Sequence, residues 1–436
     1  MNDTQAKYPQ LRFKGFADPW EQCKLGDVAK ITMGQSPNSK NYTDNPKDHI
    51  LVQGNADMKD GQVHPRIWTT EITKIADKGD LILSVRAPVG DIGKTSYDVV
   101  IGRGVAAIKG NEFIFQLLKR MKTVGYWTKY STGSTFESIN SLEINNAVIN
   151  LPKEHEQNKV GKILSYMDHA ITLHEEKKRQ LERLKSALLQ KMFANKSGYP
   201  VVRFEGFSDE WEQRKVSELA DRYDNLRVPI TASERVAGET PYYGANGIQD
   251  YVEGFTHNGE FVLVAEDGAN DLQNYPVQYV DGKVWVNNHA HVLQAKEERA
   301  DNKFLTNALK HTNIEPYLVG GGRAKLNADV MMKINFKVPT LPEQVQIGKF
   351  FDNLDHLITL HEEKKRQLER LKSALLQKMF ANKSGYPVVR FEGFSDEWEE
   401  RKLGDAVSIS SGVTGDATLQ DGEYRLHASK VFRKER

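Results

Sequence analysis

Two histidines and two carboxylates in the second half of the sequence have spacings that metal sites and nucleases use. His289 and His291 lie two residues apart on a predicted strand, so their side chains share one face. Glu266 and Asp267 follow an apolar run, a place where nuclease carboxylates occur. The histidines lack a nearby third ligand of clear identity, and no lysine follows the carboxylates at a two-residue offset. We therefore expect neither a metal site nor nuclease chemistry, and we interpret the histidines as hydrogen-bonded or DNA-facing.

Two glycine-rich segments match nucleotide-binding loops only in part. The segment GGGR, which ends at Arg323, lacks the Lys-Ser/Thr pair of a phosphate-binding loop. The segment GRG around Arg103 lacks the third glycine and the helix start of a dinucleotide-binding fingerprint. Backbone amides and a cation at defined spacing are what hold a phosphate. We therefore predict that neither segment binds a nucleotide.

The tripeptide DPW at residues 18–20 hints at the catalytic tetrapeptide of amino-methyltransferases. It belongs to an opening motif that occurs three times, starting at Tyr8 (YPQLRFKGFADPWEQCKLGDV), Tyr199 (YPVVRFEGFSDEWEQRKVSEL) and Tyr386 (YPVVRFEGFSDEWEERKLGDA). The second and third copies have DEW in place of DPW. A motif used three times is more consistent with packing the start of a domain than with catalysis. We predict no catalytic residue in the chain.

Polar turn segments are the other candidates for function. In the first half they are residues 33–37 (MGQSP), 84–94 (SVRAPVGDIGK), 101–104 (IGRG) and 131–139 (STGSTFESI). In the second half they are residues 242–248 (YYGANGI), 266–270 (EDGAN), 286–291 (VNNHAH) and 320–327 (GGGRAKLN). Arg, Asn, Gln, Ser and Thr hydrogen-bond base edges, while Lys and backbone amides hold phosphates. Ordinary hydrophilic loops have a similar composition, so composition leaves both interpretations open.

The elements that must position these segments are organised around a perfect repeat. The stretch from Ile171 to Glu212 recurs without a change from Ile358 to Glu399. Each copy begins inside a highly charged helical pattern, which in the first copy runs roughly from Glu154 to Asn195, about 60 Å at about 1.5 Å per residue. A narrow apolar stripe on so charged a helix indicates a partner helix. We predict that the two helices pair antiparallel through a seam of apolar side chains, namely Leu164, Met167, Ile171, Leu181, Leu184, Leu188, Met192, Leu354, Ile358, Leu368, Leu371, Leu375 and Met379.

The sequence outside the two helices divides into two blocks, which are similar at their beginnings and ends and differ in between. Both contain short apolar runs bounded by Gly, Pro, Asn and Asp, and one predicted helix each, from Asn111 and from Asn302. We predict an α+β fold, with two mixed α/β domains joined by two long helices that pair as an antiparallel coiled coil. The predicted boundaries are a first domain at residues 1–151, a first helix at 152–197, a second domain at 198–338, a second helix at 339–384, and a partial third copy at 385–436.

Composition sets the remaining bounds. A chain of 436 residues with 39% hydrophobic residues can build a core in both blocks. The single cysteine, Cys23, excludes a disulfide framework and a four-thiolate zinc site. No run has the length of a membrane span, and the first residues contain no apolar signal region, so we expect a cytoplasmic protein without membrane contact. The net charge of +1 means that any nucleic-acid surface must be a local patch.

Several phrases resemble a known family. They are RAPVGDIGK from Arg86, PYYGANGI from Pro241, WVNNHAHVL from Trp285, KLNADVMMKINFKVPTLPEQ from Lys325, and ITLHEEKKRQLERLKSALLQKMF in both helices. With the order of block, helix, block, helix, they resemble the specificity (S) subunits of type I restriction-modification systems over most of the chain. This resemblance implies that each block is a target-recognition domain for one half of a bipartite, asymmetric DNA sequence.

The resemblance also implies the partners. The helices would fix the gap between half-sites and dock two modification subunits, which methylate adenine N6 with S-adenosylmethionine. Restriction (motor-nuclease) subunits would then cleave unmethylated DNA with ATP and Mg. The chain itself would be non-catalytic and would bind no cofactor or metal.

The same resemblance implies DNA-contact candidates in the polar segments. They are Arg86, Lys94 and Arg103 in the first domain and Asn246, Asn270, His289, Arg323 and Lys325 in the second. Further candidates in those segments are Gln35, Ser134, Thr135, Tyr243 and Asn288. Two other classes stay open on sequence alone: a coiled-coil structural or interaction protein without DNA specificity, and a self-contained nuclease or methyltransferase.

Overall fold

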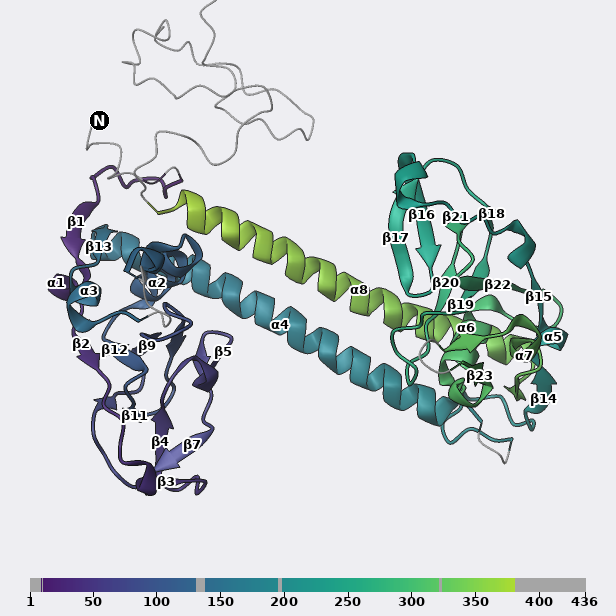
Figure 1. Cartoon of the computed structure of the whole chain (residues 1–436), viewed down its shortest axis with the longest axis horizontal. Helices are drawn as coiled ribbons and strands as arrows, with labels where there is room; N and C mark the ends of the chain where they lie inside the picture. Colours follow the sequence, from purple (N-terminus) through teal and green to yellow (C-terminus); the bar gives the residue numbers. More distant parts are fainter. Residues whose placement is uncertain (1–8, 10, 131–137, 195–197, 321–323, 381–436) are drawn as a thin grey trace, which may run out of the picture. The chain divides into compact units, whose positions relative to one another are not determined.

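The computed structural model describes residue 9 and residues 11–130, 138–194, 198–320 and 324–380. The chain divides into two compact units, each with its own sheets and core (Figure 1). The first unit comprises residues 1–167 and 370–436, and the second comprises residues 168–369. Within the described ranges, no helix combines the length and the apolar character needed to cross a membrane.

The first unit contains two larger sheets, a two-stranded sheet that is described below, and a covering helix. The six-stranded sheet has the order β2 (Ile31–Met33), β12 (Val105–Ile108), β9 (Leu81–Ser84), β10 (Ile92–Lys94), β6 (Gln62–Val63) and β5 (Met58–Lys59). The five-stranded sheet has the order β3 (Tyr42–Thr43), β7 (Ile67–Thr69), β4 (His49–Val52), β11 (Val99–Ile101) and β8 (Ile75–Ala76). Helix α2 (Glu112–Thr123) packs its apolar side chains into the main core with β9 and β12. Because these strands are short, the sequence shows no long alternation of apolar and polar residues along them.

The second unit repeats this plan with different strands. One four-stranded sheet has the order β15 (Ala220–Arg222), β22 (Ala290–Ala295), β19 (Phe261–Ala265) and β20 (Val277–Val280). Another has the order β17 (Gly247–Val252), β16 (Ala237–Gly244), β21 (Lys283–Val286) and β18 (His257–Asn258). A small ribbon pairs β23 (Leu318–Val319) with β24 (Lys325–Leu326), and helix α6 (Asn302–His311) covers the core.

Four strands and one helix form a common frame in both units. The orders β2-β12-β9-β10 and β15-β22-β19-β20 match, and every pair in each row is antiparallel. The helix that follows is capped in both cases, because the side chain of Asn111 accepts from the Ile114 amide and that of Asp301 accepts from the Phe304 amide. The sequence prediction of two mixed α/β domains is confirmed.

The opening motif packs the start of each domain, as predicted. Its strands β1 (Glu21–Lys24) and β14 (Glu212–Lys215) pair antiparallel with β13 (Val148–Leu151) and β25 (Asn335–Val338). Short helices flank them: α1 (Leu25–Val28), α3 (Ser141–Asn145), α5 (Val216–Leu219) and α7 (Ala328–Met331). Trp20 and Trp211 are each only 1% exposed. In both domains a buried glutamate also holds an arginine of the motif in a bidentate pair, Arg12 with Glu156 and Arg203 with Glu343.

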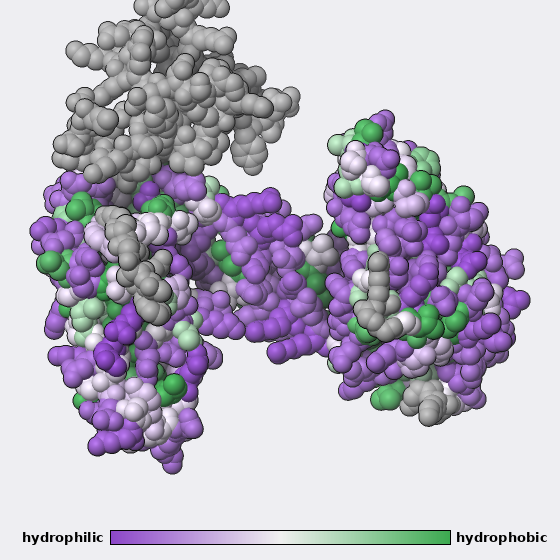
Figure 2. Space-filling view, viewed as in Figure 1, coloured by the Kyte–Doolittle hydropathy of each residue, from purple (hydrophilic) through white to green (hydrophobic). Residues whose placement is uncertain are grey.

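The two long helices pair antiparallel within the second unit. Helix α4 runs from Glu154 to Met192, and helix α8 runs from Leu341 to Lys378. Contacts between them join higher numbers in α4 to lower numbers in α8. They are the pairs Glu175–Lys365, Lys178–Glu362 and Lys185–Asp355, beside the facing rings of His174 and His361. The surface of the helices visible in Figure 2 is mainly hydrophilic. The predicted antiparallel pairing is confirmed.

Two residues of the predicted seam are wrongly placed. Leu184 and Leu371, which occupy equivalent positions in the repeat, are 48% and 52% exposed. The adjacent lysines, Lys185 and Lys372, are the more buried residues. A lysine stem can cover apolar surface while its ammonium group reaches a carboxylate, as Lys185 does at Asp355 with an N···O distance of 2.5 Å.

The other predicted seam residues divide between helix contacts and domain cores. Leu164 and Met379 are buried in the core of the first unit, and Leu181, Met192 and Leu354 are buried in the core of the second. Met167 is also buried. Half-buried members are Ile171, Leu188, Ile358, Leu368 and Leu375. The ends of each helix therefore belong to domain cores, and our sequence-based domain boundaries stay predictions.

Candidate nucleic-acid interface

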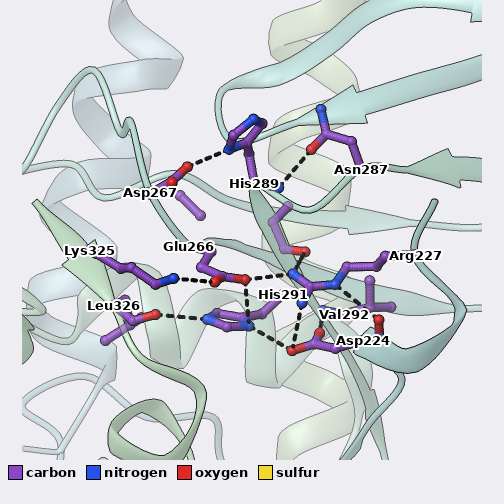
Figure 3. Close-up of polar contacts among 12 residues, drawn as sticks. Asp224, Arg227, Glu266, Asp267, Asn287, His289, His291, Val292, Lys325 and Leu326 are labelled. Carbon is purple, nitrogen blue, oxygen red and sulfur yellow. Dashed lines mark hydrogen bonds and ion pairs between the residues drawn. The ribbon is translucent and has the colours of Figure 1, made fainter. Parts of the chain in front are cut away.

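In the second unit, four polar segments meet at one end of the frame. Strand β19 ends opposite the start of β22, with Ala265 paired to Ala290. The Glu266 amide donates to the His289 carbonyl at 2.8 Å, and the Leu326 amide donates to the Glu266 carbonyl at 2.7 Å. A bridge joins Asp267 to Lys325. The segments containing Glu266, His289 and Lys325 thus lie side by side, as Figure 3 shows.

An ion-pair network of Asp224, Arg227, Glu266 and Lys325 holds these segments in place. Glu266 receives Arg227 Nη1 at 2.6 Å and Lys325 Nζ at 2.9 Å, and Arg227 Nη2 lies 3.5 Å from Asp224 Oδ2 (Figure 3). Burial alone raises the pKa of Glu266, but the hydrogen bonds from Arg227 and Lys325 outweigh burial and lower it. Burial likewise opposes a lowered pKa at Asp224, where hydrogen bonds from His291 and the Val292 amide prevail. Both carboxylates are held ionised.

The two histidines have different environments. His291 is 1% exposed, with Nδ1 2.8 Å from Asp224 Oδ2 and Nε2 2.8 Å from the Leu326 carbonyl. His289 is half-buried, with Nδ1 2.5 Å from Asp267 Oδ1 and its amide bonded to Asn287 Oδ1 at 2.8 Å. The sequence predicted that both histidine side chains would lie on one face of a strand. Only His289 is accessible, so the two do not form an exposed pair. His291 organises the loop, and His289 is the accessible candidate.

Asp224, Glu266 and His291 also have the geometry to hold a cation, since one ligand atom of each lies within 4.8 Å of the others. Glu266 already accepts from Arg227 and Lys325, and Arg227 also lies 3.5 Å from Asp224. A divalent ion would have to displace those two cations, so we interpret the group as an ion-pair network. No sequence pattern marks Asp224 or Arg227, which lie in a polar turn after β15.

The β16–β17 turn supplies the next candidates. The Asn246 side chain donates to the Gly268 carbonyl at 2.9 Å and accepts from the Asn270 amide at 3.0 Å. Asn246 therefore holds the segment after Glu266 in place, while the side chain of Asn270 remains exposed, as is that of Asn288. Tyr243 is half-buried against the core between the two sheets, and burial raises the pKa of its hydroxyl. Arg323 lies outside the described residues.

In the first unit, three predicted residues come together at the equivalent strand ends. The Gln35 amide donates to the Ile101 carbonyl at 2.8 Å, and the Arg103 amide donates to Ser36 Oγ at 3.0 Å. The Val85 amide bonds the Gly104 carbonyl at 2.9 Å, which brings Arg86 beside this turn. The side chains of Gln35, Arg86 and Arg103 are exposed.

Glycines permit this close approach of backbones. A Cβ at Gly34 would lie 2.1 Å from the Gly102 carbonyl oxygen, and one at Gly104 would lie 2.0 Å from the Gln53 carbonyl oxygen. The glycines around Arg103 thus let three turns pack together.

Lys94 is not part of this cluster. It pairs with Leu81 at the start of β9, whereas Arg86 follows the end of that strand at Ser84. Its Nζ lies 3.3 Å from Glu112 of α2. Ser134 and Thr135 lie outside the described residues.

Comparisons with known proteins explain the repeated frame. The family model for the type I restriction modification DNA specificity domain matches residues 17–183 and again residues 208–370. The chain belongs to this family. The resemblance expected from sequence is confirmed, and each unit contains most of one specificity domain.

Relatives and a solved structure agree. A protein of Haemophilus influenzae named as a type I restriction enzyme specificity subunit is 47% identical over 153 residues, or 35% of this chain and 39% of that protein. The MjaVIII specificity subunit of Methanocaldococcus jannaschii is 19% identical over 398 residues, 84% and 93% of the two chains. The crystal structure of the type I S subunit from M. genitalium has a TM-score of 0.66 at 16% identity, covering 86% of this chain and all of that one. The chain spans less than half the length of the first two relatives it matches.

Proposed function

We propose that this chain is the DNA specificity subunit of a type I restriction-modification complex, and that its two specificity domains read the two halves of a bipartite, asymmetric site. The observation that carries the proposal is that both domains share one arrangement of strands but present different polar side chains at its end. At equivalent strand ends the first domain presents Gln35, Arg86 and Arg103, and the second presents Asn270 and His289. A constant frame with different hydrogen-bonding side chains at its tip is suited to reading two different sequences.

The side-chain types support direct reading of bases in the major groove. Arginine pairs bidentately with guanine, and asparagine or glutamine pairs with adenine. His289 keeps Nε2 available, because Nδ1 is engaged by Asp267. Lys325 and the exposed Asn288 flank these groups and are suited to phosphate contacts. The ion-pair network that includes Lys325 holds these loops in place before DNA binds.

The paired helices would set the spacer between half-sites. Helices of 39 and 38 residues are each about 58 Å long at about 1.5 Å per residue. Their exposed, mainly hydrophilic faces are available for two modification subunits, which would supply S-adenosylmethionine-dependent methylation. Restriction subunits using ATP and Mg would join that core, and this chain would contribute recognition without catalysis. Family membership supports these partners.

Binding of target DNA by the complex with modification subunits tests the proposal. Arg86→Ala and Arg103→Ala should each weaken binding about 5- to 150-fold, because a bidentate base contact contributes about 1–3 kcal/mol. Lys94→Ala is the matched control, since Lys94 lies at the other end of β9 and pairs with Glu112. We expect it to change binding less than about threefold. Equal losses in all three variants would contradict the assignment of Arg86 and Arg103 as base contacts. The absence of DNA binding by the complex would favour a structural coiled-coil protein instead.

A further inference from the structure

In the first domain, residues 11–28 of the opening motif pack against a fixed set of groups, which we call the seat: the end of α8, Glu156, strand β13 and the ring of Phe113. The Leu11 amide donates to the Lys378 carbonyl at the end of α8, at 2.7 Å. Arg12 forms its bidentate pair with Glu156, and β1 pairs with β13. The Trp20 ring packs against Phe113 and Phe380, with ring centroids 5.5 Å and 6.1 Å away. The seat therefore includes the end of α8, a part of the chain far from the motif in sequence.

The second domain has the same seat, but there the motif continues directly from the helix that forms the seat. The Val202 amide donates to the Lys191 carbonyl at the end of α4, at 2.9 Å. Arg203 pairs with Glu343, β14 pairs with β25, and Trp211 packs against Phe193 and Phe304. The chain between Lys191 and Val202 is therefore long enough for the motif to fold back onto the end of α4, the helix that precedes it.

A third copy of the motif follows α8 through the same link. The sequence from Ile358 to Glu399 repeats that from Ile171 to Glu212, so Val389 follows Lys378 at the spacing at which Val202 follows Lys191. The contact residues recur as Arg390 and Trp398. Beyond the repeat, the third copy continues KLGD, which is the sequence of residues 24–27 of the first copy and differs from KVSE in the second.

We propose that residues 386–406 are a second occupant of the first-domain seat and exchange with residues 8–28. The first-domain seat includes the end of α8, and the third copy follows α8 in the sequence. In the same way, the second copy follows α4, whose end is part of the second-domain seat. Backbone pairing along β13 does not depend on side chains, and the arginine and tryptophan anchors are present in both occupants. The changes Pro19 to Glu397 and Cys23 to Arg401 also occur in the second copy, as Glu210 and Arg214, which fits its seat. The first domain can thus be completed by either copy of the motif.

The single cysteine gives a direct test. Cys23 lies on β1, partly buried against the core, and becomes accessible when residues 8–28 leave the seat. We expect a thiol reagent to label Cys23 more than about tenfold faster in the full chain than in a chain ending at Ser384, because two occupants of similar fit share one seat. The full chain with Trp398→Ala and Arg390→Glu should label as slowly as the shortened one. Equal rates in all three would overturn the exchange.

A deletion provides a second test that does not depend on the exchange rate. A chain lacking residues 2–28 should keep a folded first domain, with amide protection in β9 and β12, because the third copy fills the seat. Removing residues 385–436 as well, or adding Trp398→Ala, should abolish that protection while β19 and β22 stay protected. Loss of protection in the single deletion would refute the proposal. Neither test uses DNA, so their outcome is separate from that of the proposed function.

Discussion

Replacing Arg227 by methionine tests how the candidate surface of the second domain is held. Its guanidinium donates to Glu266 at 2.6 Å, to the Ala290 carbonyl at 2.9 Å and to the Asp224 carbonyl at 3.1 Å. The side chains of Arg227 and Glu266 are 15% and 14% exposed. Removing one partner of a mostly buried pair costs about 3–5 kcal/mol, because the other charge stays buried without compensation. Lys325 is 45% exposed and can offset only part of that loss.

Amide hydrogen exchange followed by mass spectrometry locates this effect. We expect protection in β19 and β22 to fall about 10²- to 10³-fold in Arg227→Met, while β9 and β12 keep theirs. The double variant Arg227→Met/Glu266→Gln should recover part of the protection, since it also removes the uncompensated charge. The surface pair Lys94–Glu112 in the first domain supplies the control, and Lys94→Met should cost less than about 1 kcal/mol. A loss in Arg227→Met no larger than in this control would refute our account of the network.

The folded-state pKa values of Asp224 and Glu266 are lowered, so the network contributes stability above their ordinary values of 3.8 and 4.5 and loses it as the pH falls further; acid unfolding of the second domain should show this dependence, and Arg227→Met should weaken it. Burial first, then His174 and Lys177, lower the pKa of His361, so the unfolded chain binds this proton more readily and helix pairing should weaken below about pH 6.5; thermal unfolding between pH 8 and 5.5 measures this, and His361→Gln should flatten it. Leu181→Ala should cost about 2–5 kcal/mol, whereas Leu184→Ala, at a half-exposed site, should cost less than about 1 kcal/mol; urea unfolding of the two variants compares them directly.

The helix pair was predictable because its signal is long and repeated. An apolar stripe over many turns, present twice, leaves few alternatives to antiparallel pairing in one chain. The finer register was not predictable. Stepping by three or four residues admits either Leu184 or Lys185 at one turn, and hydrophobicity favours the leucine. The structure selects the lysine because Asp355 lies within reach of its ammonium group.

The candidate surfaces were predictable only as segments. Polar loops bounded by apolar runs could be recognised, but which side chains face outward depends on hydrogen bonds between distant segments. The Asn246 side chain accepts from the Asn270 amide, and the buried His291 is hydrogen-bonded to Asp224. Lys94 pairs with Leu81, at the end of the sheet opposite to the candidate residues. Asp224 and Arg227 could not be found from the sequence, since charged residues in a turn carry no mark of burial.

We propose that the two domains read two half-sites independently through one shared frame. Methylation motif mapping in cells tests it most directly, using a chain whose residues 199–338 are replaced by those of another family member, together with the modification subunits. We predict that one half-site changes while the other half-site and the spacer stay the same. A motif that is unchanged, or one in which both half-sites change, would contradict the account.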